Sequence, residues 1–526
     1  MAGRRAGLIW LLYGITAAVS VALVLRRPSW DRLSDLHIYH GAVRHLRSGS
    51  PLYSYVADNG GPFTYPPFAA VILWPIGALP EPVVQAGWLA ATCAAVVAIA
   101  VALGGVLAVA GPRRQLVIAA VACALLVSAP VQSNLRFGQV SIFIVLLALV
   151  DGMGLTPARY RGLLVGMAAA IKLTPLLFVG YFLLARRYRD AARAGAAFVG
   201  CAVVGAAVLP GDSLTFWSGT IVNTSRIGNL ASLGNQSLHG MLLRVGVDGN
   251  TLPVLWAALV VVVCGVALLR ARALESAGQP AYAAVLVGCA TVAASPVSWT
   301  HHQVWPVLAA MLLIGTRGVA RRAAGFALLT VLVLSLGALL SQVSRTTGLQ
   351  FLFENARALA AIAICLAGFG AVAVTAGRRA PARRGGLRVA AVAAVTLAFF
   401  AVQPLPAGAD PTFKAYAMSD VDNPRYFFVC RTRADCAAFA AGAPIRIGTA
   451  AERTKVRVNG VVDATIARLE YQSAPGGAAR VIPLLPVYPG QRAFSFRSAN
   501  LSHGRLVAYD AAGTPVATYT EELAAR

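Results

Sequence analysis

The stretch SDLHIYHGAVRHLRSGSPLY, residues 34–53, gathers one aspartate, three histidines and two tyrosines directly after a long apolar segment. Carboxylate and imidazole groups are the common proton carriers in enzymes, so this composition is typical of acid–base chemistry. Asp35 is the sharpest candidate, because a carboxylate beside apolar surroundings is costly unless it has a partner or a task. We predict a catalytic role for Asp35, and the alternative is a simple ion pair with a neighbouring Arg or His.

Other polar groups interrupt the apolar sequence farther along the chain. Lys172 is the single lysine before residue 404 and lies in the motif IKLTP, at the middle of an apolar segment. The stretches SNLRFGQVS, SLGNQSLHGMLLR and SPVSWTHHQVW supply Asn134, Arg136, Gln139, Asn235, Gln236, His239, His301 and His302. Amide, hydroxyl and aromatic groups suit sugar recognition, and cations suit a phosphate. Each stretch alone could be a solvated loop, but together with Asp35 they predict one cavity.

The composition sets the class of protein. Of 526 residues, 58% are hydrophobic and 12% are charged, whereas charged residues make up about a quarter of a soluble domain. The net charge of +25 does not indicate nucleic-acid binding, because the arginines form short clusters between apolar runs. The sequence therefore predicts an all-α polytopic membrane protein.

The arginine clusters also predict a topology. A bilayer core needs about 20 apolar residues per helix, and we expect spans at 7–25, 83–110, 115–131, 139–153, 191–210, 251–269, 281–298, 303–316, 324–342, 356–376 and 388–404. Segment 161–187 has arginines at both ends and Lys172 with Pro175 at its centre, so we interpret it as a re-entrant pair of short helices that lines a cavity. The N-terminus is then cytoplasmic, and the region after residue 404 is extracytoplasmic.

The chemical groups collect on the predicted outer side. Leu36, Tyr39, Val43 and Leu46 recur at helical spacing, which predicts a helix lying on the membrane surface. Segment 66–79 is apolar but broken by proline, so we expect a re-entrant or interfacial piece. His37 and Tyr39 of the surface helix are further candidates for contacting a substrate. A metal site built from His301, His302 and Asp35 is disfavoured, because no second close-spaced pair of ligands is present.

The motifs DLHIYHGAVRHLRSGSPLY, FTYPPFAAVI, LRFGQVS, AAIKLTPLLF, GNQSLHG and SPVSWTHH, taken in this order, resemble the actinobacterial mannosyltransferases of the C-type glycosyltransferase superfamily. That family includes enzymes that build phosphatidylinositol mannosides and lipomannan, together with some arabinofuranosyltransferases. The resemblance covers residues 1 to about 404, which it marks as a transmembrane glycosyltransferase domain.

The resemblance implies a polyprenyl-phosphate-linked sugar donor, a glycolipid or glycan acceptor, an external active site in the cell membrane and an inverting mechanism. It assigns the catalytic base to Asp35. It makes Lys172 and His301 or His302 ligands of the donor phosphate or the acceptor, and it leaves the roles of Arg136, Asn235, Gln236 and His239 unassigned. No cofactor, metal or nucleic acid is expected. Two functions compete with this one: an arabinofuranosyltransferase, and a transporter or flippase for lipid or sugar. Paired internal repeats, which are typical of transporters, are not seen in the sequence.

The region 405–526 has a different composition and carries ten of the twenty acidic residues. Alternating apolar residues predict a small, mainly β domain. We expect a turn at Asn459–Gly460 and a hairpin around the DAAG motif at 510–513. Cys430 and Cys436 could close a disulfide loop if this region lies outside the cell. The resemblance does not extend to this region.

Overall fold

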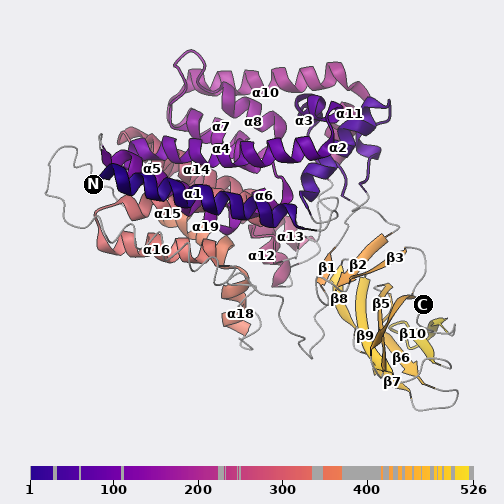
Figure 1. Cartoon of the computed structure of the whole chain (residues 1–526). Coiled ribbons are helices and arrows are strands. Elements are labelled where there is room, and N and C mark those ends of the chain that lie inside the picture. The colour runs from indigo at the N-terminus through magenta and orange to yellow at the C-terminus, as the bar shows by residue number, and fades with distance from the viewer. Residues whose placement is uncertain are drawn as a thin grey trace. The chain divides into compact units, whose positions relative to one another are not determined.

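The structure is a computed structural model of the whole chain. It describes residues 2–27, 32–57, 61–107, 112–222, 230, 233–245, 247, 250–334 and 347–369, and then 416–418, 426–430, 436–440, 445–452, 455–463, 465–473, 479–482, 484–488, 491–498 and 504–519. The chain divides into a helical unit and a β-rich unit, each compact (Figure 1). The boundary predicted near residue 404 and the span predicted at 388–404 lie outside the described residues.

The helical unit is built from long and short helices. Its α-helices are α1 (Ala2–Leu25), α2 (Ser34–Arg47), α3 (Pro67–Leu73), α4 (Glu81–Leu107), α5 (Pro112–Val127), α6 (Ala129–Phe137), α7 (Ser141–Gly152), α8 (Leu163–Ile171), α9 (Leu177–Leu184), α10 (Tyr188–Val208), α11 (Pro210–Thr215), α12 (Leu238–Arg244), α13 (Thr251–Ser276), α14 (Pro280–Ala294), α15 (Val304–Gly315), α16 (Val319–Val333), α18 (Thr347–Glu354) and α19 (Ala356–Ala367). Short 3₁₀ turns are η1 (Leu52–Ser54), η2 (Trp74–Ala78), η3 (Thr174–Leu176) and η6 (Thr300–His302), and η4 (Phe216–Thr220) is a π-turn.

Four helices among the described residues are long and apolar enough to cross a membrane: Arg5–Leu25, Glu81–Leu107, Tyr188–Val208 and Thr251–Ser276. These helices coincide with four of the predicted spans. Three of them, α1, α4 and α10, run in a similar direction across the view in Figure 1. On α10 and α13 large apolar side chains such as Val203, Val204, Val261 and Val262 are exposed. A helix that shows apolar side chains outward needs an apolar solvent, so the chain is a multi-pass membrane protein.

The helix predicted at 115–131 is bent. α5 ends at Val127 and α6 continues after a bend of 64°. Pro130 lies in the first turn of α6, where a proline is tolerated because it replaces an N–H that has no partner within the helix. The predicted loop at 132–138 is therefore largely helical. The bend turns the polar residues of α6 toward the interior, where Asn134 is fully buried.

The centre of the helical unit is α14, which is buried along nearly its whole length. Gly288 of α14 permits a close approach of α15, because a Cβ atom at this position would lie 2.0 Å from the ring of Trp305. The Trp305 ring in turn packs against Phe178 of α9, with ring centroids 5.7 Å apart. This packing fixes α9, the second helix of the predicted re-entrant pair, against the core.

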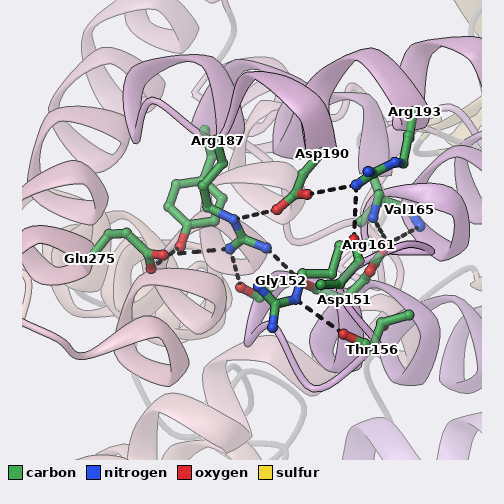
Figure 2. A network of polar contacts seen from close by, with 12 residues as sticks. Asp151, Gly152, Thr156, Arg161, Val165, Arg187, Asp190, Arg193 and Glu275 are labelled. Atoms are coloured by element: carbon green, nitrogen blue, oxygen red, sulfur yellow. Dashed lines mark hydrogen bonds and ion pairs between the residues drawn. The ribbon is translucent and has the colours of Figure 1, made fainter.

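A buried polar network ties the ends of α7, α8, α9, α10 and α13 together (Figure 2). The Arg187 guanidinium donates to the carbonyl oxygens of Gly152 and Asp151, at 2.8 and 3.2 Å, and to the Asp190 carboxylate at 2.9 Å. It also lies 3.7 Å from Glu275 of α13. The Asp151 carboxylate accepts from the backbone N–H groups that begin α8. The network therefore anchors the pair α8–α9 that carries Lys172.

Replacing Arg187 by Met is expected to lower the free energy of unfolding by about 3 kcal/mol, because Glu275 loses this cation and Asp190 keeps, among the described residues, only Arg193, at 3.3 Å. The side chains of Arg187 and Asp190 are only 13% and 12% exposed. Thermal unfolding of the detergent-purified protein measures the effect. Arg189→Met, at an exposed position of the same helix turn, is the matched control and should unfold like the wild type. Equal unfolding temperatures for all three proteins would contradict a stabilising role.

The described residues of the β-rich unit form three antiparallel sheets. Their strands are β1 (Tyr416–Met418), β2 (Tyr426–Cys430), β3 (Cys436–Ala440), β4 (Ile445–Glu452), β5 (Lys455–Asp463), β6 (Arg468–Gln472), β7 (Arg480–Ile482), β8 (Leu485–Tyr488), β9 (Gln491–Ser498), β10 (Arg505–Tyr509) and β11 (Pro515–Tyr519). The four-stranded sheets β11-β10-β6-β7 and β4-β5-β9-β8 share one core, to which Val458, Leu469, Phe494 and Leu506 contribute. This arrangement is a small β-sandwich.

Two turn predictions for this unit have different outcomes. The hairpin around DAAG is confirmed: β10 and β11 pair, and the Asp510 side chain accepts from the N–H groups of Ala512 and Thr514 in the connecting turn. The turn at Asn459–Gly460 is wrong, because both residues lie inside β5 and pair with β4 and β9. Val458, Gly460 and Val462 are all buried, so the period-two core pattern of a central strand overrides the local turn preference.

Cys430 and Cys436 are directly opposite each other in the pairing of β2 with β3. Antiparallel partners have Cα atoms about 4.5–5.5 Å apart, which lies within the range that a disulfide spans. The backbone register is therefore compatible with the proposed disulfide, which stays a prediction.

Candidate active site

Asp35 lies in the first turn of α2, and this turn is docked on the end of α6. The N–H of Leu33, which precedes α2 with a positive φ of 51°, donates to the Arg136 carbonyl oxygen at 2.9 Å. Gly138 ends α6 with φ of 67°, and a Cβ atom there would lie 2.6 Å from Leu36 Cβ. Glycine is required at this place for both reasons. These contacts place the start of α2 directly against the turn that leads to Gln139.

The Asp35 carboxylate accepts a short hydrogen bond from the Gln139 amide. The other atom of that amide, Gln139 Oε1, accepts from the Tyr65 hydroxyl at 3.1 Å, and Tyr65 and Tyr39 share a hydrogen bond of 3.0 Å between their hydroxyls. Tyr39, Tyr65 and Gln139 are buried, while Asp35 is half-buried. A network of buried hydroxyl and amide groups therefore surrounds a carboxylate that keeps access to solvent.

Burial raises the pKa of Asp35 from 3.8 to about 6. The hydrogen bond from Gln139 and the charges of Lys172 and Arg136 act in the opposite direction and hold the pKa down. Burial penalises the charged form, whereas a donor or a nearby cation favours it. The result is a carboxylate that is mostly ionised at neutral pH and still basic enough to take a proton, as a general base requires.

Lys172 joins the site from the turn between α8 and α9. It lies between α8 and η3 in extended conformation, with φ −151° and ψ 122°, so the chain leaves the helix at this residue. Pro175 in η3 maintains the break, since proline cannot continue the preceding hydrogen-bond pattern. Lys172 Nζ lies 2.5 Å from His302 Nε2 and 5.4 Å from the centre of the Tyr65 ring. The IKLTP turn thus brings a lysine next to the Asp35 network.

The two adjacent histidines of the SWTHH loop have different environments. His302 Nδ1 accepts from the Trp299 N–H at 3.1 Å, so in neutral His302 the ring proton is on Nε2, the atom that faces Lys172. An N–H and an ammonium group are both donors, so this contact forms with the uncharged Lys172 amine as acceptor, and a charged Lys172 must turn from His302 toward an anion. His301 is buried against Phe137, with ring centroids 5.9 Å apart, and neither of its ring nitrogens has a hydrogen-bond partner among the described residues. Burial, followed by the charge of Lys172, lowers the pKa of both histidines well below 6.5.

A hollow of about 350 Å³, measured with its open mouth, lies beside Lys172 and His302. Its wall includes the side chains of Ser141, Thr174 and Trp305. A wall that combines hydroxyl groups with an aromatic ring suits a sugar or a sugar phosphate. The hollow is compatible with the cavity predicted from the sequence.

Asn235 and Gln236 use their amides to hold the backbone. Asn235 accepts from the Ser298 N–H at 2.8 Å and donates to the Pro296 carbonyl oxygen at 3.1 Å. Gln236 donates to the Glu354 carbonyl oxygen at 2.7 Å and accepts from the Ala358 N–H at 3.1 Å. The Asn235 amide therefore fixes the start of the SWTHH loop, and the Gln236 amide fixes the junction of α18 and α19.

The remaining predicted residues have separate surroundings. His37 contacts the Glu81 carboxylate at 2.8 Å, at the start of α4. His239 packs edge-on against Trp256 of α13, with ring centroids 5.7 Å apart. Arg136 stacks over Phe137 and contributes its charge to the surroundings of Asp35. The structure therefore groups Asp35, Tyr39, Lys172, His302 and Arg136, and it places Glu81 against His37 and Trp256 against His239.

Tyr65 and Gln139 belong to the same group. The sequence placed Gln139 among the polar groups of the predicted cavity without giving it a role of its own, and it did not single out Tyr65 for chemistry. The signal in the sequence is the motif LRFGQVS, in which glycine at a helix end directs the following glutamine back toward the bundle.

The fold and this site define a membrane protein in which a carboxylate, a lysine and a histidine lie close together among buried helices. Residues 63–296 match the model of glycosyltransferase family 87. A polyprenol-phosphate-mannose-dependent alpha-(1-2)-phosphatidylinositol mannoside mannosyltransferase of Mycobacterium tuberculosis is 33% identical over 353 residues, which cover 62% of this chain and 81% of the relative. A mannosyltransferase of the same name from Mycolicibacterium smegmatis is 33% identical over 331 residues, covering 57% of this chain and 74% of the relative.

A polyprenol-phosphate-mannose-dependent alpha-(1-2)-phosphatidylinositol pentamannoside mannosyltransferase of Mycolicibacterium smegmatis is also 33% identical, over 56% of this chain and 74% of the relative. No solved structure matches the chain. The chain belongs to glycosyltransferase family 87 and is a glycosyltransferase.

Proposed function

We propose that the protein transfers a mannosyl residue from polyprenyl-phosphate-mannose, with inversion, to a lipid-linked or envelope glycan acceptor. The observation that carries this proposal is that Asp35, held by Gln139, and Lys172, held beside His302, lie near enough to influence each other. Two of the relatives named above act on phosphatidylinositol mannoside and one on the pentamannoside, and all depend on polyprenol-phosphate-mannose. A phosphatidylinositol mannoside is therefore the first acceptor to test.

The reaction needs one proton acceptor and one cationic site. Asp35 takes the proton of the acceptor hydroxyl while that oxygen forms a bond to the anomeric carbon of the sugar. The bond between the anomeric carbon and the phosphate oxygen breaks, and its electron pair stays on polyprenyl phosphate. Lys172 and the Nε2–H of His302 stabilise the departing phosphate by charge and hydrogen bonding. The leaving group is already an anion of low basicity, so no protein acid is needed.

The membrane topology is part of the proposal. Arginine clusters at 4–5, 113–114, 159–161, 186–193, 270–272, 317–322 and 378–384 favour a cytoplasmic N-terminus and an extracytoplasmic site and β-rich unit. The number of crossings stays at the eleven predicted from the sequence. A phosphatase reporter fused after residue 404 should be active; an inactive phosphatase fusion together with a fluorescent cytoplasmic reporter would contradict this topology.

The direct test uses purified protein in lipid with polyprenyl-phosphate-mannose and a mannosylated phosphatidylinositol acceptor, analysed by mass spectrometry. An acceptor heavier by one hexose is the expected result. Extension with polyprenyl-phosphate-arabinose alone would identify an arabinofuranosyltransferase instead. Movement of labelled donor across the bilayer without transfer would favour a transporter.

The pH dependence of transfer should reflect the raised pKa of Asp35. The base form is required, so the initial rate should fall about tenfold per pH unit below pH 6 and be level above about pH 7. Initial rates between pH 4.5 and 8.5, with both substrates saturating, measure this acid limb. A rate that stays level down to pH 4.5 would contradict a base with a raised pKa.

A further inference from the structure

We propose that Gln139 is the positioning residue of the catalytic base: its amide holds one carboxylate oxygen of Asp35 and thereby directs the other oxygen to the acceptor hydroxyl. The inference rests on the proposed function, because it takes Asp35 as the base. Gln139 contacts the Asp35 carboxylate and influences the reaction through that base.

The amide has a defined orientation. A carboxylate only accepts hydrogen bonds when ionised, so the amide nitrogen of Gln139 must face Asp35. Gln139 Oε1 then faces the Tyr65 hydroxyl at 3.1 Å and the Ser141 hydroxyl at 3.4 Å, both of which can donate. The Tyr39 hydroxyl lies 3.0 Å from that of Tyr65 and extends this series of hydrogen bonds. Rotating the amide by half a turn would place an oxygen against the carboxylate, so this network fixes one arrangement.

The backbone supports the same contact. The Gln139 N–H donates to the Asn134 carbonyl oxygen at 3.1 Å, and Asn134 itself donates to the His301 carbonyl oxygen at 2.8 Å. Gln139 is 5% exposed. The turn that carries the amide is thus tied to the loop that carries the two histidines. A base held by a rigid neighbour needs no reorganisation when the acceptor arrives.

The charged and titratable groups that face Asp35 determine how its pKa would respond to the loss of the Gln139 amide. Lys172 and Arg136 favour the ionised carboxylate, and Tyr39 and Tyr65 are neutral hydroxyls beside it. Removing the Gln139 donor deletes one of the three interactions that oppose burial. The proton on Asp35 is then held more tightly, so the base form appears only at higher pH.

The test compares Gln139→Leu with Gln132→Leu and the wild type. Gln132 lies in α6, the helix that leads to Gln139, and its amide donates to Ser20 and to the Leu126 carbonyl oxygen, away from Asp35. For Gln139→Leu we expect kcat at pH 7 to fall by about 10- to 100-fold and the acid limb of the rate profile to move up by about one pH unit. KM for the donor should change little. Gln132→Leu should keep the wild-type acid limb.

A second measurement does not depend on turnover. Infrared titration of purified protein follows the carboxyl band of Asp35, identified by its loss in Asp35→Asn. A titration midpoint in Gln139→Leu above that of the wild type supports the inference. Midpoints and acid limbs that coincide with the wild type, in a variant with a wild-type unfolding temperature, would overturn it. Full activity of Asp35→Asn would instead show that Asp35 is not the base. That result would contradict the proposed function rather than the role of Gln139 alone.

Discussion

Replacement of Asp35 by Asn is expected to reduce sugar transfer by about 10³-fold, the range in which general bases contribute. Asn keeps the shape of the side chain and can still accept from the Gln139 amide, but it cannot take the proton of the acceptor hydroxyl. Transfer by purified variant and wild type, measured at equal protein and saturating substrates at pH 7.5, gives the ratio directly. The effect should appear in kcat, with KM for the donor nearly unchanged.

The same replacement should leave the fold intact. The pKa of Asp35 is raised to about 6 in the folded protein, from an ordinary value of 3.8. A raised carboxyl pKa means that ionisation destabilises the folded state, and this loss develops between about pH 4 and pH 6. At pH 7.5 a neutral Asn removes the cost, so the unfolding temperature of Asp35→Asn should equal or exceed that of the wild type. A residue retained at a cost in stability is typical of a functional site.

Asp212→Asn is the matched control for Asp35→Asn. Asp212 is another acidic residue of the predicted outer side, and its carboxylate accepts from the Leu52 N–H at 2.8 Å. Asn preserves that acceptor, so we expect transfer within about threefold of the wild type. If Asp35→Asn were as active as Asp212→Asn, the base would have to be a different residue.

The sequence predicted the parts of this protein that depend on local pattern. Long apolar runs predicted α1, α4, α10 and α13, because a hydrocarbon solvent selects helices of that length. The break at IKLTP was predicted from one proline and one lysine in an apolar segment, and the structure has a turn at that place. Asp35 stood out as a carboxylate beside apolar sequence. These inferences need only the nature and spacing of neighbouring residues.

The parts that depend on contacts between distant residues were not predictable. Gln139 and Asp35 are separated by 104 positions, and their contact arises from the docking of α2 on α6 through Gly138. Asn235 and Gln236 were candidates for contacting the donor phosphate or the acceptor on residue type, which stays a prediction; the structure shows their amides bonded to the backbone. An amide side chain suits either use, so its role depends on which partner the fold supplies. The turn predicted at Asn459 failed for the same reason. Its strand, β5, pairs with β4 on one side and β9 on the other, and these distant partners decide its conformation.

Replacement of Lys172 by Met is expected to lower kcat by about 100- to 1,000-fold, because the departing phosphate loses the cation that stabilises it. Lys172→Arg, which retains the charge, should recover part of the rate. The readout specific to this role is product inhibition: polyprenyl phosphate should inhibit the wild type and Lys172→Arg but inhibit Lys172→Met much less. Inhibition constants from initial rates measure this difference.

The charge of Lys172 also favours the ionised form of Asp35, so the two effects of losing it must be separated. If Lys172 acts on the leaving phosphate, Lys172→Met remains slow well above pH 7, where Asp35 is ionised in any case, and its product inhibition is weak. If Lys172 acts only through Asp35, the rate recovers at high pH and product inhibition is unchanged. The first pattern requires that Lys172 Nζ, which lies 2.5 Å from His302 Nε2 in the structure, turns to a phosphate oxygen, so the two residues form the anion site together.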